Sequence, residues 1–305
     1  MDAQTKESVW DPSGNIAVAE MNSRIKYAAF TFGWREAVRI ILRKGVPVSE
    51  LNVAEVGCGS GTMALTFALM GASVSLIDFN QKALDSARDF YQGYGAEAEY
   101  INQDCVNNPP EKIKGNYDLV ISSGLLEHFT GKYRKACLNY HKELLNKDGF
   151  VFIGAPNSYS PWYRFIKFLR IMTGTWKIDL EVSFSAKELK MLAEEVGLKD
   201  SYVIAYSGWF EDFKYHVGGF FSALGDMLPK TIRMPLREWK RSLSEQSNIQ
   251  VVNTADEMRE FCGDMAAAVK NGDAGMVKGR GLLDGLSSGL VLFAFNAANP
   301  ARNGL

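Results

Sequence analysis

Three closely spaced glycines directly follow a short apolar run in the first third of the chain. Residues 53–62 read Val-Ala-Glu-Val-Gly-Cys-Gly-Ser-Gly-Thr, so a β-rich run leads into the glycines and a helical pattern follows them. Glycine has no Cβ to keep a ligand away from the backbone, and the first turn of a helix offers free N–H groups. The pattern therefore predicts a ligand-binding turn at the carboxyl end of a strand.

The spacing of these glycines narrows the class of ligand. The dinucleotide fingerprint G-x-G-x-x-G would need glycine at position 62, where Thr62 stands, so NAD is a poor fit. Asp78 ends the next β-rich run, where a carboxylate can accept hydrogen bonds from ribose hydroxyls. Asp104 follows a third such run and is placed to accept from an adenine amino group. Together these three loops favour an adenosine-containing ligand other than NAD.

Five segments, in this order, resemble the class I S-adenosylmethionine (SAM)-dependent methyltransferases. They are EVGCGSG from residue 55, IDFN from 77, NQDC from 102, YDLVISSGLLEHF from 117 and LLNKDGFVFIGAPN from 144. The resemblance covers about half the chain, residues 51–206. It implies a Rossmann-like α/β fold with a mostly parallel sheet of seven strands, the last antiparallel, and it implies SAM as the cofactor.

The resemblance also assigns cofactor-binding residues. Glu55 and the glycines would hold the methionine and ribose part of SAM, Asp78 the ribose hydroxyls and Asp104 the adenine amine. The full predicted set is Glu55, Gly57, Cys58, Gly59, Gly61, Asp78, Phe79, Asp104, Cys105, Ser122 and Gly124.

Methyl transfer from a sulfonium is an in-line displacement, so the protein supplies orientation, exclusion of water and, where needed, a base. His128 follows the fourth β-rich run and is the candidate base, because histidine titrates near neutral pH. A histidine that only packs beside the cofactor is the alternative. Aromatic rings can stabilise the sulfonium or stack on an acceptor. The candidate substrate-binding residues are Tyr27, Trp34, Tyr159, Trp176 and Trp209.

Strand and helix patterns alternate along the chain, which predicts a parallel sheet covered by helices on both faces. The β-rich runs are 52–56, 73–78, 98–102, 117–122, 150–155, 202–206 and 290–295. The distance between the last two runs is too long for a simple connection, which predicts an inserted helical cap. The expected domains are an N-terminal helical region 1–50, a SAM-binding core 51–207, a cap 208–288, and the last core strand with the C-terminus, 289–305.

Composition excludes several classes of protein. The formal net charge of −1 gives no general attraction to nucleic acid. The NPPE segment from residue 108 resembles a base-methyltransferase signature but precedes the fourth strand instead of following it. The four cysteines and three histidines show no metal-ligand spacing, so we expect reduced thiols and no metal. The N-terminus lacks a signal-peptide pattern and no apolar run is long enough for a membrane span, which favours the cytoplasm.

Two basic, apolar-rich segments allow more than one interpretation. Residues 162–170 place apolar side chains on one helical face and basic ones elsewhere, which is typical of a lid helix and also of a membrane-surface helix. Basic residues at 233–241 fit either a solvated helix face or a site for an acidic acceptor.

We expect SAM-dependent methylation of a small-molecule acceptor in an enclosed site, at oxygen, with the oligomeric state left open. One alternative is intramolecular cyclisation of SAM, as in azetidine-2-carboxylate formation, which releases methylthioadenosine. A second is a SAM-binding protein without catalysis.

Overall fold

The structure, a computed structural model, describes residues 22, 24–26, 28–29, 31–174, 176, 180–206, 255–271 and 287–297. Tyr27, Trp209 and the basic residues at 233–241 lie outside these ranges, as does most of the predicted cap. The predictions made for them therefore stay predictions.

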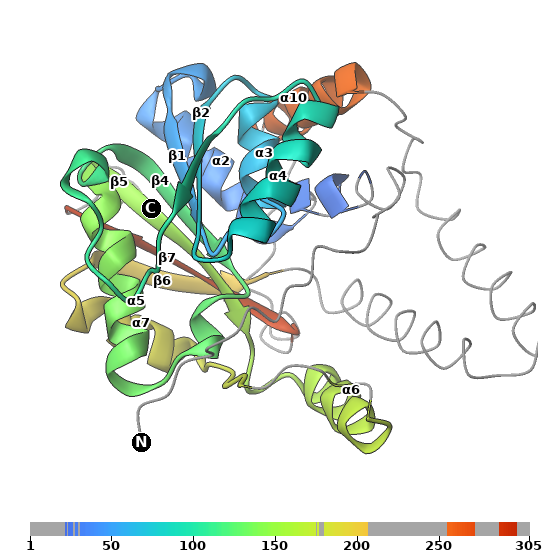
Figure 1. Ribbon diagram of the computed structural model, residues 1–305, viewed down its shortest axis with the longest axis vertical. Coiled ribbons are helices and arrows are strands. Elements are labelled where there is room, and N and C mark those ends of the chain that lie inside the picture. Colours follow the sequence, from blue (N-terminus) through green and yellow to red (C-terminus); the bar gives the residue numbers. More distant parts are fainter. Residues whose placement is uncertain are drawn as a thin grey trace, which may run out of the picture.

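A seven-stranded sheet forms the centre of the fold, in the order β3-β2-β1-β4-β5-β7-β6 (Figure 1). The strands are β1 (Asn52–Val56), β2 (Ser73–Asp78), β3 (Glu99–Asn102), β4 (Tyr117–Ser123), β5 (Leu145–Pro156), β6 (Lys199–Ala205) and β7 (Gly289–Phe295). All neighbouring pairs are parallel except those of β7, which runs antiparallel to β5 and β6. The predicted sheet, with its antiparallel last strand, is confirmed.

The central strands are apolar on both sides because both faces of the sheet are covered. On β4, Leu119 and Ile121 belong to one buried cluster and Val120 to the other, as the two-residue repeat of a strand requires. The sheet thus separates two hydrophobic cores, each closed by its own helices.

The first face is covered by α2 (Phe32–Lys44), α3 (Thr62–Ala68), α4 (Gln81–Gly93) and α10 (Ala255–Lys270), and the second by α5 (Gly131–Leu144) and α7 (Ala186–Glu195) (Figure 1). Met258 and Cys262 of α10 are fully buried in the first core. Arg259 donates to the carbonyl oxygens of Tyr94 and Gly95 at 3.0 and 2.9 Å. This part of the predicted insertion therefore packs on the helical layer of the core.

Local sequence signals explain the helix boundaries. The Thr31 hydroxyl accepts from the N–H of Trp34 to start α2, and Gly45, with φ +69°, ends it. Ser185 and Glu188 form the predicted capping box at the start of α7. Short 3-10 turns η1 (Val48–Glu50), η2 (Glu111–Ile113) and η3 (Leu126–His128) join the larger elements, and α6 (Pro161–Met172) follows β5.

Two strands extend beyond their predicted runs. β5 begins at Leu145 and β6 at Lys199, and both include a register irregularity close to those starts. Apart from the buried Leu145, most of the added residues are polar and partly or fully exposed, so a hydrophobic pattern gives little signal there. Among the described residues, no helix has the length and apolarity needed to cross a membrane.

Candidate active site

Strand pairing brings the predicted binding loops to one edge of the sheet. Val56 pairs with Ile77, Asp78 with Asn102, and Glu55 with Ile121. The loops after β1, β2, β3 and β4 therefore leave the sheet side by side at its carboxyl edge, which is where ligands bind in open parallel sheets.

The glycine-rich turn after β1 depends on backbone geometry that other residues adopt poorly. Gly57, Gly59 and Gly61 have φ values of +62°, +51° and +67°. A Cβ on Gly57 would lie 2.5 Å from a methyl carbon of Leu125, and one on Gly61 would lie 2.8 Å from a methyl carbon of Leu76. Two of the three glycines are thus needed by the packing of the protein itself as well as by the turn.

Glu55 is a buried carboxyl beneath this turn. Its Oε2 accepts from the N–H of Ala64 at 2.8 Å, in the first turn of α3. Burial, aided by the nearby charge of Asp78, raises the pKa of Glu55 to about 8, although the Ala64 hydrogen bond opposes the shift. The hydrogen bond between Glu55 and Ala64 therefore links β1 to α3 across the glycine-rich turn.

Asp78 ends β2 and binds two backbone N–H groups. Its Oδ2 accepts from Gly59 at 3.1 Å and its Oδ1 from Asn80 at 2.9 Å. Burial raises the pKa of Asp78 and these hydrogen bonds limit the rise. Each oxygen has a second lone pair, so the carboxylate can also accept from a ligand.

The loop after β3 completes this part of the edge. Asp104 is half-buried, and its Oδ1 accepts from the N–H of Val106 at 3.1 Å in a local turn. Phe79, at the end of β2, is 48% exposed and offers a flat apolar surface. Cys58 and Cys105 are buried, and the Cys105 sulfur lies 3.5 Å from that of Cys137, so both predicted cysteines pack in the interior of the domain.

The end of β4 carries two buried polar atoms without a hydrogen-bond partner in the described part of the chain. They are Ser122 Oγ and Glu127 Oε2. Gly124, with φ +76°, is exposed between them, and a Cβ on it would lie 3.7 Å from Glu127 Oε1. Burial raises the pKa of Glu127 to about 8, and nearby Glu181 adds to the shift. Sequence reasoning missed Glu127, because the only signal was its position beside His128.

His128 lies in η3, and its Nδ1 is 2.7 Å from the carbonyl oxygen of Leu180. A carbonyl oxygen can only accept, so Nδ1 carries the proton of this hydrogen bond. In the neutral ring Nε2 is then the basic nitrogen. The tautomer that a general base needs is therefore favoured by a contact between residues far apart in the sequence.

Further charged groups lie beside Glu127. Lys167 Nζ is 2.9 Å from Glu181 Oε1 and 4.9 Å from the ring centre of Trp176. Burial raises the pKa of Glu181 to about 7. Arg134 donates to the carbonyl oxygen of Val182 at 3.0 Å. These contacts hold residues 180–182 and α6 near the loop after β4.

The predicted aromatic residues occupy different environments. Trp34 is fully buried and donates from its ring N–H to Thr66 at 2.7 Å. It is a core residue with no surface for an acceptor, which corrects its prediction as a substrate contact. Tyr159 is 68% exposed and Trp176 is partly exposed, and both flank α6 at the carboxyl edge of the sheet.

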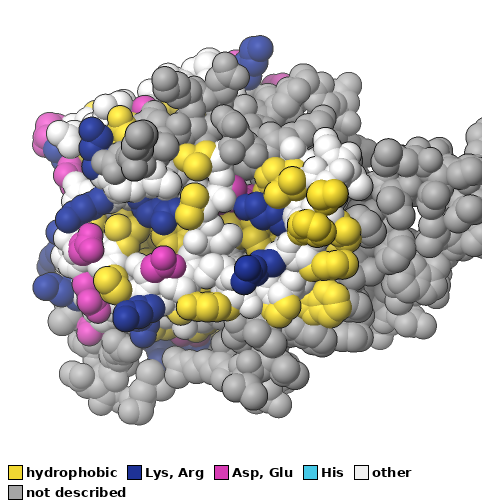
Figure 2. Space-filling view, turned by 90° about the horizontal axis from the view of Figure 1, so that it is seen from below, with side chains coloured by type: hydrophobic (Ala, Val, Ile, Leu, Met, Phe, Trp, Pro, Cys, Tyr) yellow, Lys and Arg dark blue, Asp and Glu magenta, His cyan; other side chains and the backbone are white. Residues whose placement is uncertain are grey.

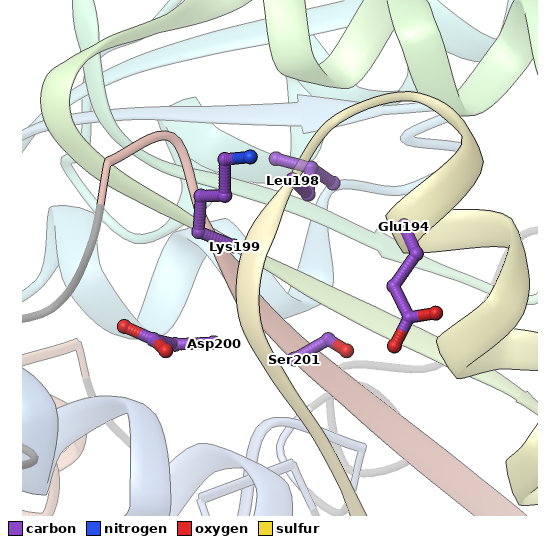
Figure 3. A pocket seen from close by; sticks show the side chains of 5 residues that line it. All are labelled: Glu194, Leu198, Lys199, Asp200 and Ser201. Atoms are coloured by element: carbon purple, nitrogen blue, oxygen red, sulfur yellow. The ribbon is translucent and has the colours of Figure 1, made fainter.

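A hollow of about 350 Å³ lies at the opposite edge of the sheet, between α7 and the start of β6 (Figure 3). It is lined by Glu194, Leu198, Lys199, Asp200 and Ser201. Lys199 pairs with Phe295 at the last residue of β7, which places the hollow at the amino edge of the parallel strands. It is therefore separate from the glycine-rich turn and contains none of the predicted binding residues.

Comparison with known proteins identifies the domain to which the four loops belong. Residues 53–149 match the family profile described as methyltransferase domain, which spans β1 to the start of β5 and includes all four loops of the edge. The chain therefore contains a methyltransferase domain of the SAM-dependent class over residues 53–149. This family uses SAM, whose sulfonium supplies an electrophilic methyl group.

One curated relative of the chain is the ubiquinone biosynthesis O-methyltransferase of Yersinia pestis strain Pestoides F. The two are 31% identical over 119 residues, which cover 38% of this chain and 47% of the relative. The chain thus matches about half the length of the curated relatives, and activity beyond the shared domain is a matter for proposal.

Two solved structures are among those to which the chain is similar. A SAM-dependent methyltransferase from Archaeoglobus fulgidus is 14% identical, with a TM-score of 0.45 over 86% of this chain and 94% of that one. The magnesium protoporphyrin IX methyltransferase of Synechocystis PCC 6803, solved with bound S-adenosylhomocysteine (SAH), is 17% identical, with a TM-score of 0.47 over 65% of this chain and 85% of that one.

The side chains at the carboxyl edge fit SAM. Carboxylates at the ends of β1 and β2 and after β3 can accept from hydroxyl and amino groups, and Ser122 Oγ is a buried polar atom without a partner among the described residues. Burial penalises such an atom unless a ligand or water binds it. The carboxyl edge therefore offers hydrogen-bond acceptors of the kind that the hydroxyl and amino groups of an adenosyl ligand require.

Proposed function

We propose that this methyltransferase transfers the methyl group of SAM to an oxygen of a small-molecule acceptor. The observation that carries the proposal is the pair of buried carboxyls, Glu55 and Asp78, joined through the glycine-rich turn inside the matched methyltransferase domain. The printed activity of the Yersinia relative, O-methylation in ubiquinone biosynthesis, supports oxygen as the acceptor atom.

We assign each part of SAM to residues according to their position at the carboxyl edge. Asp78 would accept from the ribose hydroxyls, Asp104 from the adenine amine, and Glu55 with Gly57, Gly59 and Gly61 would hold the methionine part. Asp78 holds the Gly59 N–H at 3.1 Å, so its geometry is set before the ligand arrives. The remaining members of the set, Phe79, Cys58, Cys105, Ser122 and Gly124, would line the adenosyl pocket.

His128 would act as the base for the acceptor hydroxyl. Its Nδ1–H donates to the Leu180 carbonyl oxygen, which orients the ring and makes Nε2 the basic nitrogen of the neutral tautomer. Glu127 beside it is buried and its raised pKa keeps it protonated near neutral pH. The neutral Glu127 therefore does not compete with His128 for the proton of the acceptor hydroxyl.

The acceptor would bind between the loop after β4 and the segment around α6. Tyr159 and Trp176 provide aromatic surface there. The proposed domain division is unchanged: a helical region 1–50, a core 51–207, a cap 208–288 and a last strand within 289–305. Because α10 packs on the first core, the rest of the cap would enclose the acceptor. The four cysteines are free buried thiols, which supports a reducing compartment such as the cytoplasm.

Product analysis tests the proposal. Enzyme and SAM are incubated with a panel of phenolic and carboxylic small molecules, and SAH and methylated product are measured by mass spectrometry. We expect SAH only when an acceptor is present. Methylthioadenosine formed from SAM alone would instead establish cyclisation, and SAM binding without turnover across the panel would establish a non-catalytic binder.

A further inference from the structure

Helix α6 (Pro161–Met172) lies at the carboxyl edge of the sheet but stands away from the two helical layers (Figure 1). The Ser160 hydroxyl caps it by accepting from the N–H of Tyr163 at 3.3 Å. Ile166 is its only buried residue. The helix is therefore formed by local signals and anchored along one narrow stripe, which leaves most of its surface outside the core.

The exposed side of α6 is apolar. Phe165, Phe168, Ile171 and Met172 are 52%, 57%, 54% and 69% exposed. At the 3.6-residue repeat of a helix these four side chains fall on one side. Figure 2 shows hydrophobic side chains gathered on the part of the surface where α6 lies, with Lys and Arg side chains beside them. Soluble proteins seldom expose such a contiguous patch without a binding role.

All charged side chains of α6 are basic. The helix contains Arg164, Lys167 and Arg170 and no acidic residue. Lys167 forms an ion pair with Glu181 at 2.9 Å, so the helix and its partner keep a net positive charge. Arg164 is exposed beside the apolar side chains. Long basic side chains of this kind can extend their charge to a polar interface while their stems stay in apolar surroundings.

This charge pattern favours an anionic lipid surface over a second copy of the chain as the partner of the apolar face. In a twofold dimer each copy contributes the same patch, so the basic residues of one α6 would meet those of the other with no acid on either helix. An anionic lipid surface provides both an apolar layer for the four exposed side chains and negative charge for the arginines.

We propose that α6 binds the surface of anionic membranes, lying in the plane of the interface with Phe165, Phe168, Ile171 and Met172 inserted. Arg164, exposed beside the inserted side chains, then contacts lipid headgroups. Because α6 follows β5 at the carboxyl edge, this orientation turns the edge that carries the candidate active site toward the membrane. The inference concerns a surface and holds whether or not the proposed acceptor is correct.

Vesicle co-sedimentation of the full chain tests the proposal. Vesicles of phosphatidylcholine with phosphatidylglycerol are compared with vesicles of phosphatidylcholine alone. We expect binding to the anionic vesicles, weakened by salt, and about fivefold weaker binding for Arg164→Ala, since a basic residue near an anionic surface contributes about 1 kcal/mol. The double variant Phe165→Ser/Phe168→Ser is expected to lose at least about tenfold in partitioning.

The matched control is Met191→Ser on α7, which removes a 47% exposed apolar side chain elsewhere. It should bind vesicles as the parent chain does, and circular dichroism should show that all variants fold. Equal binding of the double variant and the parent would overturn the proposal, as would no binding to anionic vesicles. A parent dimer in light scattering that the double variant converts to a monomer, without lipid binding, would assign the face to a second copy.

Discussion

The two halves of the carboxyl edge are held in different ways. On the side of β1, β2 and β3, each carboxylate binds backbone N–H groups of its own or a neighbouring loop, as Asp78 does with Gly59 and Asn80. On the side of β4 and β5, contacts join distant segments, as between His128 and Leu180, while Glu127 Oε2 has no partner among the described residues.

This difference indicates two kinds of binding surface. Backbone groups are fixed by the fold, so the side of β1, β2 and β3, which we propose binds the adenosyl group, is formed in advance and should bind its ligand with little rearrangement. The proposed acceptor side depends on long-range side-chain contacts. It also contains buried polar atoms that have no hydrogen-bond partner within the described part of the chain, which raises its energy until a ligand satisfies them. Substitutions on the two sides should therefore affect different quantities.

The largest effect is expected at His128. Replacing it with Asn keeps a polar side chain but removes the basic nitrogen, so kcat should fall about 100-fold to 10,000-fold, the usual contribution of a general base. Affinity for SAH, measured by calorimetry, should stay within about twofold because the adenosyl side is untouched. An unchanged kcat would show that the histidine only packs beside the cofactor.

Asp78→Ala should affect ligand binding at the side of β1, β2 and β3. The substitution removes acceptors for the Gly59 N–H and for the proposed ribose hydroxyls, and hydrogen bonds to a charged group contribute about 1.5–3 kcal/mol. We expect SAH affinity to fall about 100-fold in calorimetry. Asp85→Ala, on the exposed face of α4, is the control and should bind normally. Equal affinities for the two variants would contradict a preformed ribose site.

Glu127→Gln should change how stability depends on pH. The pKa of Glu127 is about 8 in the folded chain against an ordinary value of 4.5, so between these values the folded state keeps a proton that the unfolded state loses. Stability then decreases as pH rises through this window, by about 1.4 kcal/mol per pH unit, and stops decreasing above about pH 8.

The glutamine variant lacks this titration. Between pH 6 and pH 7.5 its free energy of unfolding should therefore fall about 2 kcal/mol less than that of the parent chain. Urea unfolding at several pH values measures the difference, with Glu195→Gln on the exposed side of α7 as control. Parallel pH curves for the parent and Glu127→Gln would argue against a buried, protonated carboxyl at this position.

Gly57→Ala tests the contact that links the two halves. An alanine Cβ would lie 2.5 Å from Leu125 at φ +62°, whereas Gly45→Ala adds a Cβ at φ +69° with no atom within 4 Å. Gly57→Ala should therefore cost about 1–2 kcal/mol more in free energy of unfolding than Gly45→Ala. The double variant Gly57→Ala/Leu125→Ala should cost less than the sum of its single changes. Additive costs would mean that the clash relaxes elsewhere.

Much of the adenosyl side was predictable because its information is local. Glycines with positive φ, an acid at a strand end and a capping serine are each defined by a few consecutive residues, and strand alternation sets the order of the loops. From the sequence alone we predicted the fold class, the seven strands, the antiparallel last strand and the methyltransferase family. Strand ends were less exact where β5 and β6 include irregular pairing.

Tertiary structure decided the environment of individual side chains. Trp34, Tyr159 and Trp176 are all aromatic in sequence, yet only the packing of α2 against the sheet and α3 makes Trp34 a core residue. In the same way, Glu127 becomes a buried carboxyl, and His128 acquires a defined tautomer, through segments about fifty residues away. Residue types and spacing determine which chemistry is possible, but burial and long-range contacts determine which groups are positioned to perform it.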